Sequence, residues 1–282
     1  MTSSKRTVLI TGCSDGGLGA ALAIAFHEAG LHVYATARNP SKMAQLAARG
    51  IETRTLDVLS ESSIAKCVSE LSSLDILINN AGASYTMPVS DLSITEAKKL
   101  FDLNVWSYLA MTQAFLPLLL KSKGMIVNQT SIASVTTLPF QSAYAASKSA
   151  MAMFSNTQRL ELEPFGITIV ELKTGVVKSN FIRNIQKEET QSCLPEGSIY
   201  GPAKEVVEKA LRQDGFADSG MPAQQWANKV TQDLLRKNPP PVIWRGEEAW
   251  LARIAAILPF GMFDGMVKKM TGLDVVERIM RT

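Results

Sequence analysis

Residues 7–19 read TVLITGCSDGGLG, so that an apolar, β-branched run passes through a glycine-rich loop into a helical pattern over residues 18–29. Glycines let a backbone turn tightly and approach a pyrophosphate, and free N–H groups at a helix start stabilise its negative charge. A plain tight turn is the alternative interpretation. Because the loop lies at the first junction between strand and helix, we expect it to bind the phosphates of a dinucleotide.

Short β-branched runs alternate with helical patterns over the first two thirds of the chain. The expected strands are residues 7–11, 32–36, 51–56, 75–79, 124–130 and 168–173. The expected helices between them include residues 18–29, 62–72, 95–121 and 142–165. Ser41 and Ser60 are expected to cap helices, and Gly30 and Gly50 to end them. Regular succession of strand, helix and strand predicts an α/β fold with a doubly wound parallel sheet of the Rossmann type.

The last third of the chain has a different character. A polar segment with prolines and glycines is followed by two helical patterns at residues 203–212 and 222–236. A short run at residues 242–244 is expected to be a last strand at the sheet edge, and an apolar, methionine-rich tail follows Glu247. We expect a single domain in which residues 1–185 form the dinucleotide-binding and catalytic core. Residues 186–282 then supply a substrate lid, the last strand and a helical tail.

Composition excludes several classes of function. The net charge is only +3 and the basic residues are scattered, which argues against nucleic acid as a partner. Three distant cysteines fit a reducing compartment, and no signal peptide is expected before residue 7, so the cytoplasm is the expected location. The only histidines, His27 and His32, have no Cys, Asp or Glu at ligand spacing, so no metal site is expected.

Two Tyr-x-x-x-Lys pairs occur, Tyr144 with Lys148 and Tyr200 with Lys204. The second is interrupted by a Gly-Pro pair, which prevents helical pairing, so we interpret it as part of a loop. The first lies in a good helix former, and both side chains share one face. Ser131 stands thirteen residues before Tyr144, at a strand end. Taken singly, a capping serine, a core tyrosine and a solvated lysine are the plain alternatives.

The glycine-rich loop, Asn-Asn-Ala-Gly at residues 79–82 and the first Tyr-Lys pair, in this order, resemble the short-chain dehydrogenase/reductase family over about residues 5 to 180. The resemblance implies a catalytic set that consists of Asn104, Ser131, Tyr144 and Lys148. It implies that the cofactor is bound by Gly12, Ser14, Gly16, Gly17, Leu18, Arg38, Asp57, Asn80, Ala81, Gly82, Tyr144, Lys148, Val177 and Ser179.

The chain departs from the family pattern at two places. An extra loop residue makes Gly16-Gly17 a doublet, which leaves open which glycine takes the middle role of the family's Thr-Gly-x-x-x-Gly-x-Gly. Thr174-Gly175 stands where the family usually has Pro-Gly. The loop, Thr174-Gly175 and Ile-Trp-Arg-Gly at residues 243–246 are similar to fungal-type NADPH-dependent 1-acyldihydroxyacetone-phosphate reductases.

The end of the second expected strand indicates which dinucleotide is bound. An NAD enzyme usually has a carboxylate there for the ribose 2′-hydroxyl. Here no acid is present, and Arg38 offers a guanidinium that suits a 2′-phosphate. A surface arginine that opens a loop is the alternative. We therefore expect NADPH, with Asp57 at the adenine.

The catalytic set implies a proton transfer. A free tyrosine has a pKa near 10, and lowering it by about 3 units requires roughly 4 kcal/mol of differential stabilisation. Lys148 and an oxidised nicotinamide are expected to supply it, while Ser131 donates to the substrate oxygen and Asn104 positions Lys148. We expect reduction of a ketone. Oxidation of a secondary alcohol and a non-catalytic NADP(H)-binding regulatory role are the alternatives.

The substrate and partners are less defined by the residues. The substrate wall is expected to comprise Ser84, Tyr85, Val135, Thr136, Phe140 and Gln141. The segment from Lys178 onward is expected to close over it. The apolar tail at residues 250–263 either packs on the body or pocket, or contacts a partner or a lipid surface. The resemblance implies a lipid-like or polyketide-like ketone, a homodimer or homotetramer, and peripheral contact with endoplasmic reticulum or lipid droplets.

Overall fold

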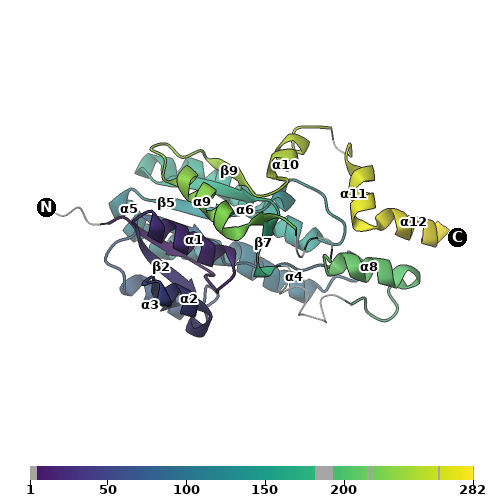
Figure 1. Ribbon diagram of the computed structural model, residues 1–282, viewed down its shortest axis with the longest axis horizontal. Coiled ribbons are helices and arrows are strands. Elements are labelled where there is room, and N and C mark those ends of the chain that lie inside the picture. The colour runs from purple at the N-terminus through teal and green to yellow at the C-terminus, as the bar shows by residue number, and fades with distance from the viewer. Residues whose placement is uncertain (1–4, 182–192, 215, 217–218, 260, 282) are drawn as a thin grey trace.

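The computed structural model describes residues 5–181, 193–214, 216, 219–259 and 261–281. Its main sheet has seven parallel strands in the order β3-β2-β1-β4-β5-β6-β9 (Figure 1). The chain adds strands toward one side of β1 as far as β3, and toward the other side of β1 from β4 onward. In chain order these strands are β1 (Thr7–Ile10), β2 (His32–Ala37), β3 (Glu52–Thr55), β4 (Ile76–Asn79), β5 (Met125–Gln129), β6 (Thr168–Thr174) and β9 (Val242–Arg245). The expected doubly wound sheet and its last edge strand are both confirmed.

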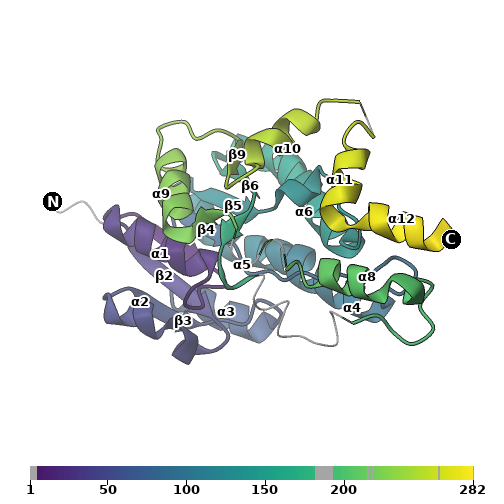
Figure 2. The same cartoon turned by 45° about the vertical axis from the view of Figure 1, so that its right-hand side comes forward.

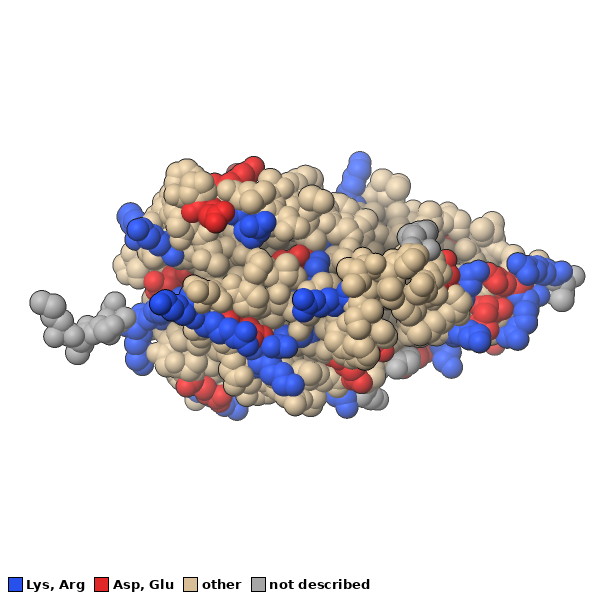
Figure 3. Space-filling view, turned by 90° about the horizontal axis from the view of Figure 1, so that it is seen from above, with Lys and Arg blue, Asp and Glu red and all other residues tan. Residues whose placement is uncertain are grey.

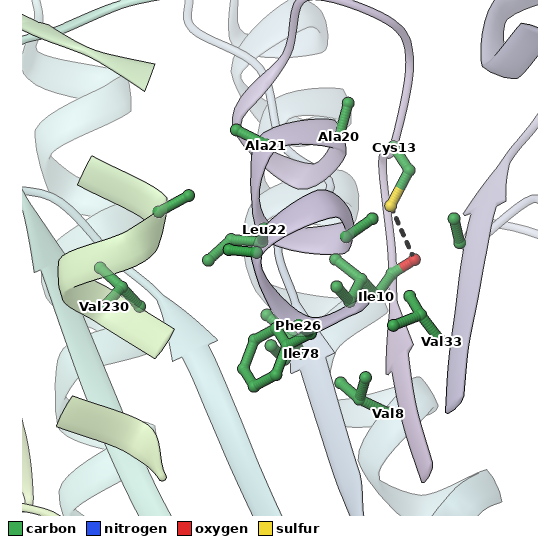
Figure 4. Close-up of a cluster of buried hydrophobic side chains, with 14 of the residues drawn as sticks. Val8, Ile10, Cys13, Ala20, Ala21, Leu22, Phe26, Val33, Ile78 and Val230 are labelled. Atoms are coloured by element: carbon green, nitrogen blue, oxygen red, sulfur yellow. Dashed lines mark hydrogen bonds between the residues drawn. The ribbon is translucent and has the colours of Figure 1, made fainter. Parts of the chain in front are cut away.

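Helices cover both faces of the sheet because its strands are apolar on both sides. On one face, α1 (Leu18–Glu28) packs beside α9 (Ala223–Leu234). Figure 4 shows Leu22 and Phe26 of α1 lying between the strands and Val230 of α9, all three fully buried. The helices of the other face are α3 (Glu61–Ser69), α5 (Ser107–Ser122) and α6 (Ser142–Leu162). With helices on both faces of a parallel sheet, the carboxyl ends of all the strands lie at the same edge.

Several local expectations are corrected by the structure. The single helix expected over residues 95–121 is α4 (Ile94–Phe101), a widened π-helical turn at Asp102–Trp106, and α5. Although this helical stretch is long and apolar enough to cross a membrane, 44% of its most apolar window is buried inside the protein. Ser60 does cap α3, accepting a bond from the Ser63 N–H. Ser41 does not cap a helix, because Asn39 accepts the Ser41 N–H at 3.0 Å instead.

The last third adds α8 (Lys204–Leu211), α10 (Ala249–Ala255), α11 (Asp264–Thr271) and α12 (Leu273–Arg281) to the same body. A second small sheet joins β7 (Val177–Lys178) to β8 (Met221–Pro222). Figure 2 shows α12 lying along α8, where Val276 is buried against the α8 side chains. Helix α12 therefore packs beside α8, and α11 packs against α12, away from the first two strands of the sheet.

Candidate active site

A cavity of about 610 Å³ lies at the carboxyl ends of the central strands, on the side where the strand order reverses. This edge is where doubly wound sheets bind their ligands. Most of the residues expected to form the site line this cavity. They are Gly12, Ser14, Gly17, Leu18, Arg38, Asp57, Asn80, Ala81, Gly82, Ser131, Tyr144, Lys148, Val177 and Ser179. Gly16 and Asn104 are not among the lining residues.

The loop after β1 has the shape that a pyrophosphate needs. Gly12 has a positive φ of 73°, and a Cβ there would lie 2.8 Å from the Ala81 Cα. A Cβ on Gly19 would lie 2.5 Å from the Gly12 carbonyl oxygen. Gly17 stands at the N-cap of α1, where no side chain of the described residues caps the helix and no acid occupies its first turn. The N–H groups of this helix start are therefore suited to hold phosphate.

The structure separates the two glycines of the doublet. Gly17 faces the cavity. Gly16 has a φ of 77°, and a Cβ on it would lie 2.4 Å from the Asn180 Nδ2. The Asn180 N–H donates to the Gly16 carbonyl at 3.1 Å, and its side chain donates to the Asp15 carbonyl at 2.9 Å. Gly16 therefore contacts the segment after β7 and is not among the residues that line the cavity, and its expected contact with the cofactor stays a prediction.

The far end of the cavity carries positive charge. Arg38 follows β2 and is exposed beside the cavity, with no ion pair to any residue in the described part of the chain. Lys42 also lines the cavity, and its carbonyl accepts the Asp15 N–H at 2.7 Å. Lys42 was not predicted as a site residue, although a second cation four residues after Arg38 was a usable signal. Asp15 and Asp57 line the same cavity, but neither makes an ion pair with Arg38 or Lys42. Two cations that no carboxylate of the described residues pairs with suit a 2′-phosphate.

Tyr144 and Lys148 lie one turn apart on α6 and both face the cavity. Tyr144 is 9% exposed and Lys148 is 4% exposed. The Lys148 Nζ donates to the Gln129 carbonyl at 2.9 Å and lies 5.9 Å from the centre of the Tyr144 ring. Ser131, at the end of β5, hydrogen-bonds with Tyr144. The three side chains that proton transfer to a carbonyl oxygen needs therefore converge at one wall.

Burial sets the protonation of this pair. Desolvation raises the pKa of Tyr144 above its ordinary value, and the hydrogen bond with Ser131 lowers it. Desolvation also lowers the pKa of Lys148 to about 8. Burial therefore favours the neutral phenol. The expected stabilisation of the phenolate by Lys148 together with an oxidised nicotinamide stays a prediction.

Asn104 lies in the π-helical turn and is fully buried. Its side-chain oxygen accepts the Ala83 N–H, and its amide donates to the Ala83 carbonyl, both at 3.0 Å. The amide also donates to the Ser147 Oγ at 3.0 Å. Asn104 therefore ties the loop after β4 to the helix that carries Lys148, and makes no direct hydrogen bond to the Lys148 amine.

The Thr174-Gly175 departure has a structural counterpart. The Thr174 Oγ1 accepts a bond from the Gln129 Nε2 at 2.8 Å. Gln129 is also the residue whose carbonyl holds Lys148. A hydrogen bond between β5 and β6 thus fixes the bend where a proline ring usually does.

The substrate wall differs in part from expectation. Ser84 and Gln141 line the cavity. Tyr85 and Phe140 are buried behind it in the cluster that includes Tyr144, and Val135 and Thr136 do not line it. Phe181, in the segment expected to close over the substrate, lines the cavity, and the lining residues that were not predicted include Ile132, Ala133, Leu138, Gln213 and Phe216. Much of the expected lid, residues 182–192, lies outside the described residues.

The second Tyr-Lys pair and the tail lie away from the cavity. Tyr200 packs edge-on against Phe140, with ring centres 5.8 Å apart, and precedes a 3₁₀ turn, as expected of a loop residue. In the tail, Ala249 and Ala252 are buried against the body, whereas Trp250 is 67% and Ile257 83% exposed. None of the described tail residues lines the cavity.

Comparisons with known proteins agree with this geometry. The family model for short chain dehydrogenases matches residues 6–190. A short-chain dehydrogenase/reductase of Pestalotiopsis microspora is 60% identical over 281 residues, covering 100% of this chain and 99% of that protein. An NADPH-dependent 1-acyldihydroxyacetone phosphate reductase of Schizosaccharomyces pombe is 36% identical over 277 residues, covering 94% of each. The solved structure of a short-chain dehydrogenase from Streptomyces avermitilis has a TM-score of 0.76 at 25% identity and covers 99% of both chains.

Proposed function

Because the chain belongs to the short-chain dehydrogenase family and is an oxidoreductase acting on CH–OH and C=O groups, we propose that it reduces a ketone to a secondary alcohol with NADPH. The observation that carries the proposal is the convergence of Ser131, Tyr144 and Lys148 on the cavity that the phosphate loop also lines. The family resemblance drawn from the sequence is confirmed by the comparisons. The direction of the reaction and the choice of NADPH belong to the proposal.

The charge at the β2 end supports NADPH. Arg38 and Lys42 both line the cavity, and neither makes an ion pair with any residue that the structure describes. A 2′-phosphate would supply a negatively charged partner for both cations, and the Arg38 guanidinium offers two parallel donors to it. The name of the Schizosaccharomyces pombe relative includes NADPH dependence, which agrees with this choice.

The residues of the wall divide the chemistry between them. Bound NADPH supplies a hydride to the carbonyl carbon. The Ser131 hydroxyl donates to the carbonyl oxygen as negative charge develops there, and the Tyr144 hydroxyl delivers the proton. The Lys148 amine, held by the Gln129 carbonyl, lies beside the phenol when it becomes phenolate. Burial of Tyr144 and Lys148 limits the access of water to the oxygen.

The cavity walls support an apolar substrate with a few polar groups. Leu138, Phe181 and Phe216 give apolar and aromatic surface, and Gln141 and Gln213 add amides. The buried Ser84 Oγ lines the same cavity and finds no hydrogen-bond partner among the described residues. A lipid-like or polyketide-like ketone with oxygen substituents satisfies both kinds of surface.

Exposed apolar side chains on α6 and the π-helical turn support an oligomer. Trp106 is 52%, Met153 67% and Leu160 60% exposed, and the Trp106 ring packs edge-on against Phe154 at 6.0 Å. Isolated surface residues need no partner, but apolar side chains gathered on neighbouring helices are typical of an interface. We propose a homodimer or homotetramer formed through this face.

We propose a cytoplasmic location with peripheral lipid contact, and the exposed side chains of the tail support the lipid contact. Trp250, Ile254 and Ile257 are exposed on and after α10, near Arg253. Figure 3 shows a largely uncharged surface around α10, whereas acidic and basic side chains alternate at the α12 end. An apolar face next to a cation is suited to the surface of endoplasmic reticulum or a lipid droplet.

A ketone panel tests the proposed reaction. The purified protein is mixed with NADPH and apolar ketones of increasing size, while NADPH absorbance is followed and the products are identified by mass spectrometry. We expect one NADPH to be consumed for each secondary alcohol formed, with little turnover from NADH. If no ketone is consumed while the secondary alcohols are oxidised with NADP⁺ at a useful rate, the proposed direction is wrong.

A further inference from the structure

Two charged residues are buried behind the active site, and the proposed chemistry uses neither. Glu171 and Lys173 point to the same face of β6, with only 4% and 6% of their surfaces exposed. The Lys173 Nζ lies 2.5 Å from the Glu171 Oε1. Taking two charges out of water costs several kcal/mol per ion, and a buried pair is often no more stable than apolar residues of the same size. Stability alone therefore does not account for this pair.

Each charge makes one contact to the segment that carries Ser131. The Thr130 Oγ1 donates to the Glu171 Oε1 at 2.8 Å. The Lys173 Nζ donates to the Ser134 Oγ at 2.9 Å. Thr130 directly precedes Ser131, and Ser134 ends the 3₁₀ turn that Ser131 caps. The ion pair thus holds both ends of the segment, with the reactive hydroxyl between them.

The neighbouring contacts connect this segment to the other catalytic groups. Within the turn, the bonds are local, from the Ala133 N–H to the Ser131 Oγ at 3.1 Å and from the Ser134 N–H to the Ser131 carbonyl at 3.0 Å. The Ser134 carbonyl accepts the Ser149 hydroxyl at 2.9 Å, one residue after Lys148 on α6. A short turn of this kind moves as a unit unless contacts from outside fix it.

The side of the pair that faces the sheet edge is also closed. The Lys173 Nζ lies 5.4 Å from the centre of the Trp244 ring on β9. Lys173 and Trp244 are register partners on the adjacent strands. The Lys173 ammonium is therefore surrounded by a carboxylate, a hydroxyl and an aromatic ring. Among these neighbours, the Ser134 hydroxyl is the group that connects the ammonium to the turn after Ser131.

We propose that Glu171 and Lys173 are positioning residues that fix the Ser131 hydroxyl for the reaction, by holding Thr130 from one end and Ser134 from the other. The inference rests on the proposed function insofar as Ser131 acts on the substrate oxygen. Misplacement of a hydrogen-bond donor by a fraction of an ångström is enough to weaken its effect on a transition state. The pair acts through Ser131 and does not touch the substrate.

The test cuts each contact while leaving the ion pair in place. In Ser134→Ala, Lys173 keeps Glu171, and in Thr130→Val, Glu171 keeps Lys173, so neither charge is left alone. We expect kcat to fall roughly tenfold in each variant, the equivalent of one charge-assisted hydrogen bond. The KM for the ketone and the Kd for NADPH should stay within about twofold in Ser134→Ala, since Ser134 does not line the cavity.

A double-mutant cycle shows whether the effect passes through Ser131. In a Ser131→Ala background, Ser134→Ala should lower kcat no further, because the group that it positions is gone. Ser122→Ala is the matched control. It removes a part-buried hydroxyl that donates to the Leu74 carbonyl at 2.6 Å. Both residues lie at the amino ends of strands β4 and β5, away from the active site. That variant should lose thermal stability while keeping kcat.

Amide hydrogen exchange keeps this test separate from the proposed function. Exchange at residues 131–135 should accelerate in Ser134→Ala relative to Ser122→Ala, whether or not any ketone is turned over. If wild-type protein reduces no ketone, the proposed function fails while the exchange result still decides whether the pair holds the turn. The positioning role is overturned by unchanged kcat in both contact variants, by losses that multiply with Ser131→Ala, or by unchanged exchange in residues 131–135.

Discussion

Replacement of Lys148 by methionine tests how burial of the active-site amine changes the dependence of the free energy of unfolding on pH. Lys148 is 4% exposed, and burial lowers its pKa from 10.5 to about 8. As the pH rises, the folded protein loses this proton near pH 8, whereas the unfolded chain holds it to about pH 10.5. Between these values the unfolded state binds more protons, so the free energy of unfolding of the wild type rises with pH.

The magnitude follows from the two pKa values. Below pH 8 the folded protein bears the cost of a charged, buried amine, and this cost disappears as the amine becomes neutral. Between about pH 7 and about pH 9.5 the wild type should gain about 2 kcal/mol relative to Lys148→Met. The variant also loses the bond to the Gln129 carbonyl. A neutral amine still donates that bond, so its loss shifts the comparison by a constant and leaves the dependence on pH.

Urea unfolding of both proteins across this range measures the difference. Other lysines and tyrosines titrate in both proteins and cancel from the comparison. The wild-type curve should rise toward alkaline pH relative to that of the variant. Parallel curves for the two proteins would mean that burial does not lower the pKa of the Lys148 amine. The position assigned to this amine beside Tyr144 would then be contradicted.

Three other variants test separate parts of the account. Arg38→Ala should weaken NADPH binding about tenfold, the loss of one charge-assisted contact, and leave NADH binding unchanged in fluorescence titration; equal losses for both cofactors would contradict the 2′-phosphate assignment. Gly19→Ala should lower NADPH affinity by more than about tenfold because its Cβ would lie 2.5 Å from the Gly12 carbonyl oxygen, and unaltered affinity would show that the loop does not hold the phosphates. Met153→Glu with Leu160→Glu should shift the sedimentation coefficient to that of a monomer, because it places charges on an apolar face, and an unchanged coefficient would place the interface elsewhere.

Much of the fold was predictable because the local signals agree with one another. Each strand of the main sheet is a short β-branched run, and the loop after the first strand fixes the edge at which the site lies. The run at residues 242–244 was recognisable as the last strand after three consecutive prolines. These features depend on neighbouring residues alone, which is why sequence patterns capture them.

The features that were missed depend on contacts between distant segments. The π-helical turn at Asp102–Trp106 was not predicted, because residues 95–121 read as one continuous helical pattern. Only the structure shows that Gly16 contacts Asn180 while Gly17 lines the cavity. The charged residues of β6 look like a solvent-facing alternation in sequence, and their burial follows from the helix and the turn that cover them.

The most direct test of the central claim is single-turnover NADPH oxidation by Tyr144→Phe. The variant keeps the ring that packs 6.0 Å from Phe181 and removes only the hydroxyl that supplies the proton. With a ketone that the wild type reduces, we expect the rate to fall about a thousandfold or more while the Kd for NADPH stays within about twofold. Reduction at the wild-type rate would show that the proton comes from another group.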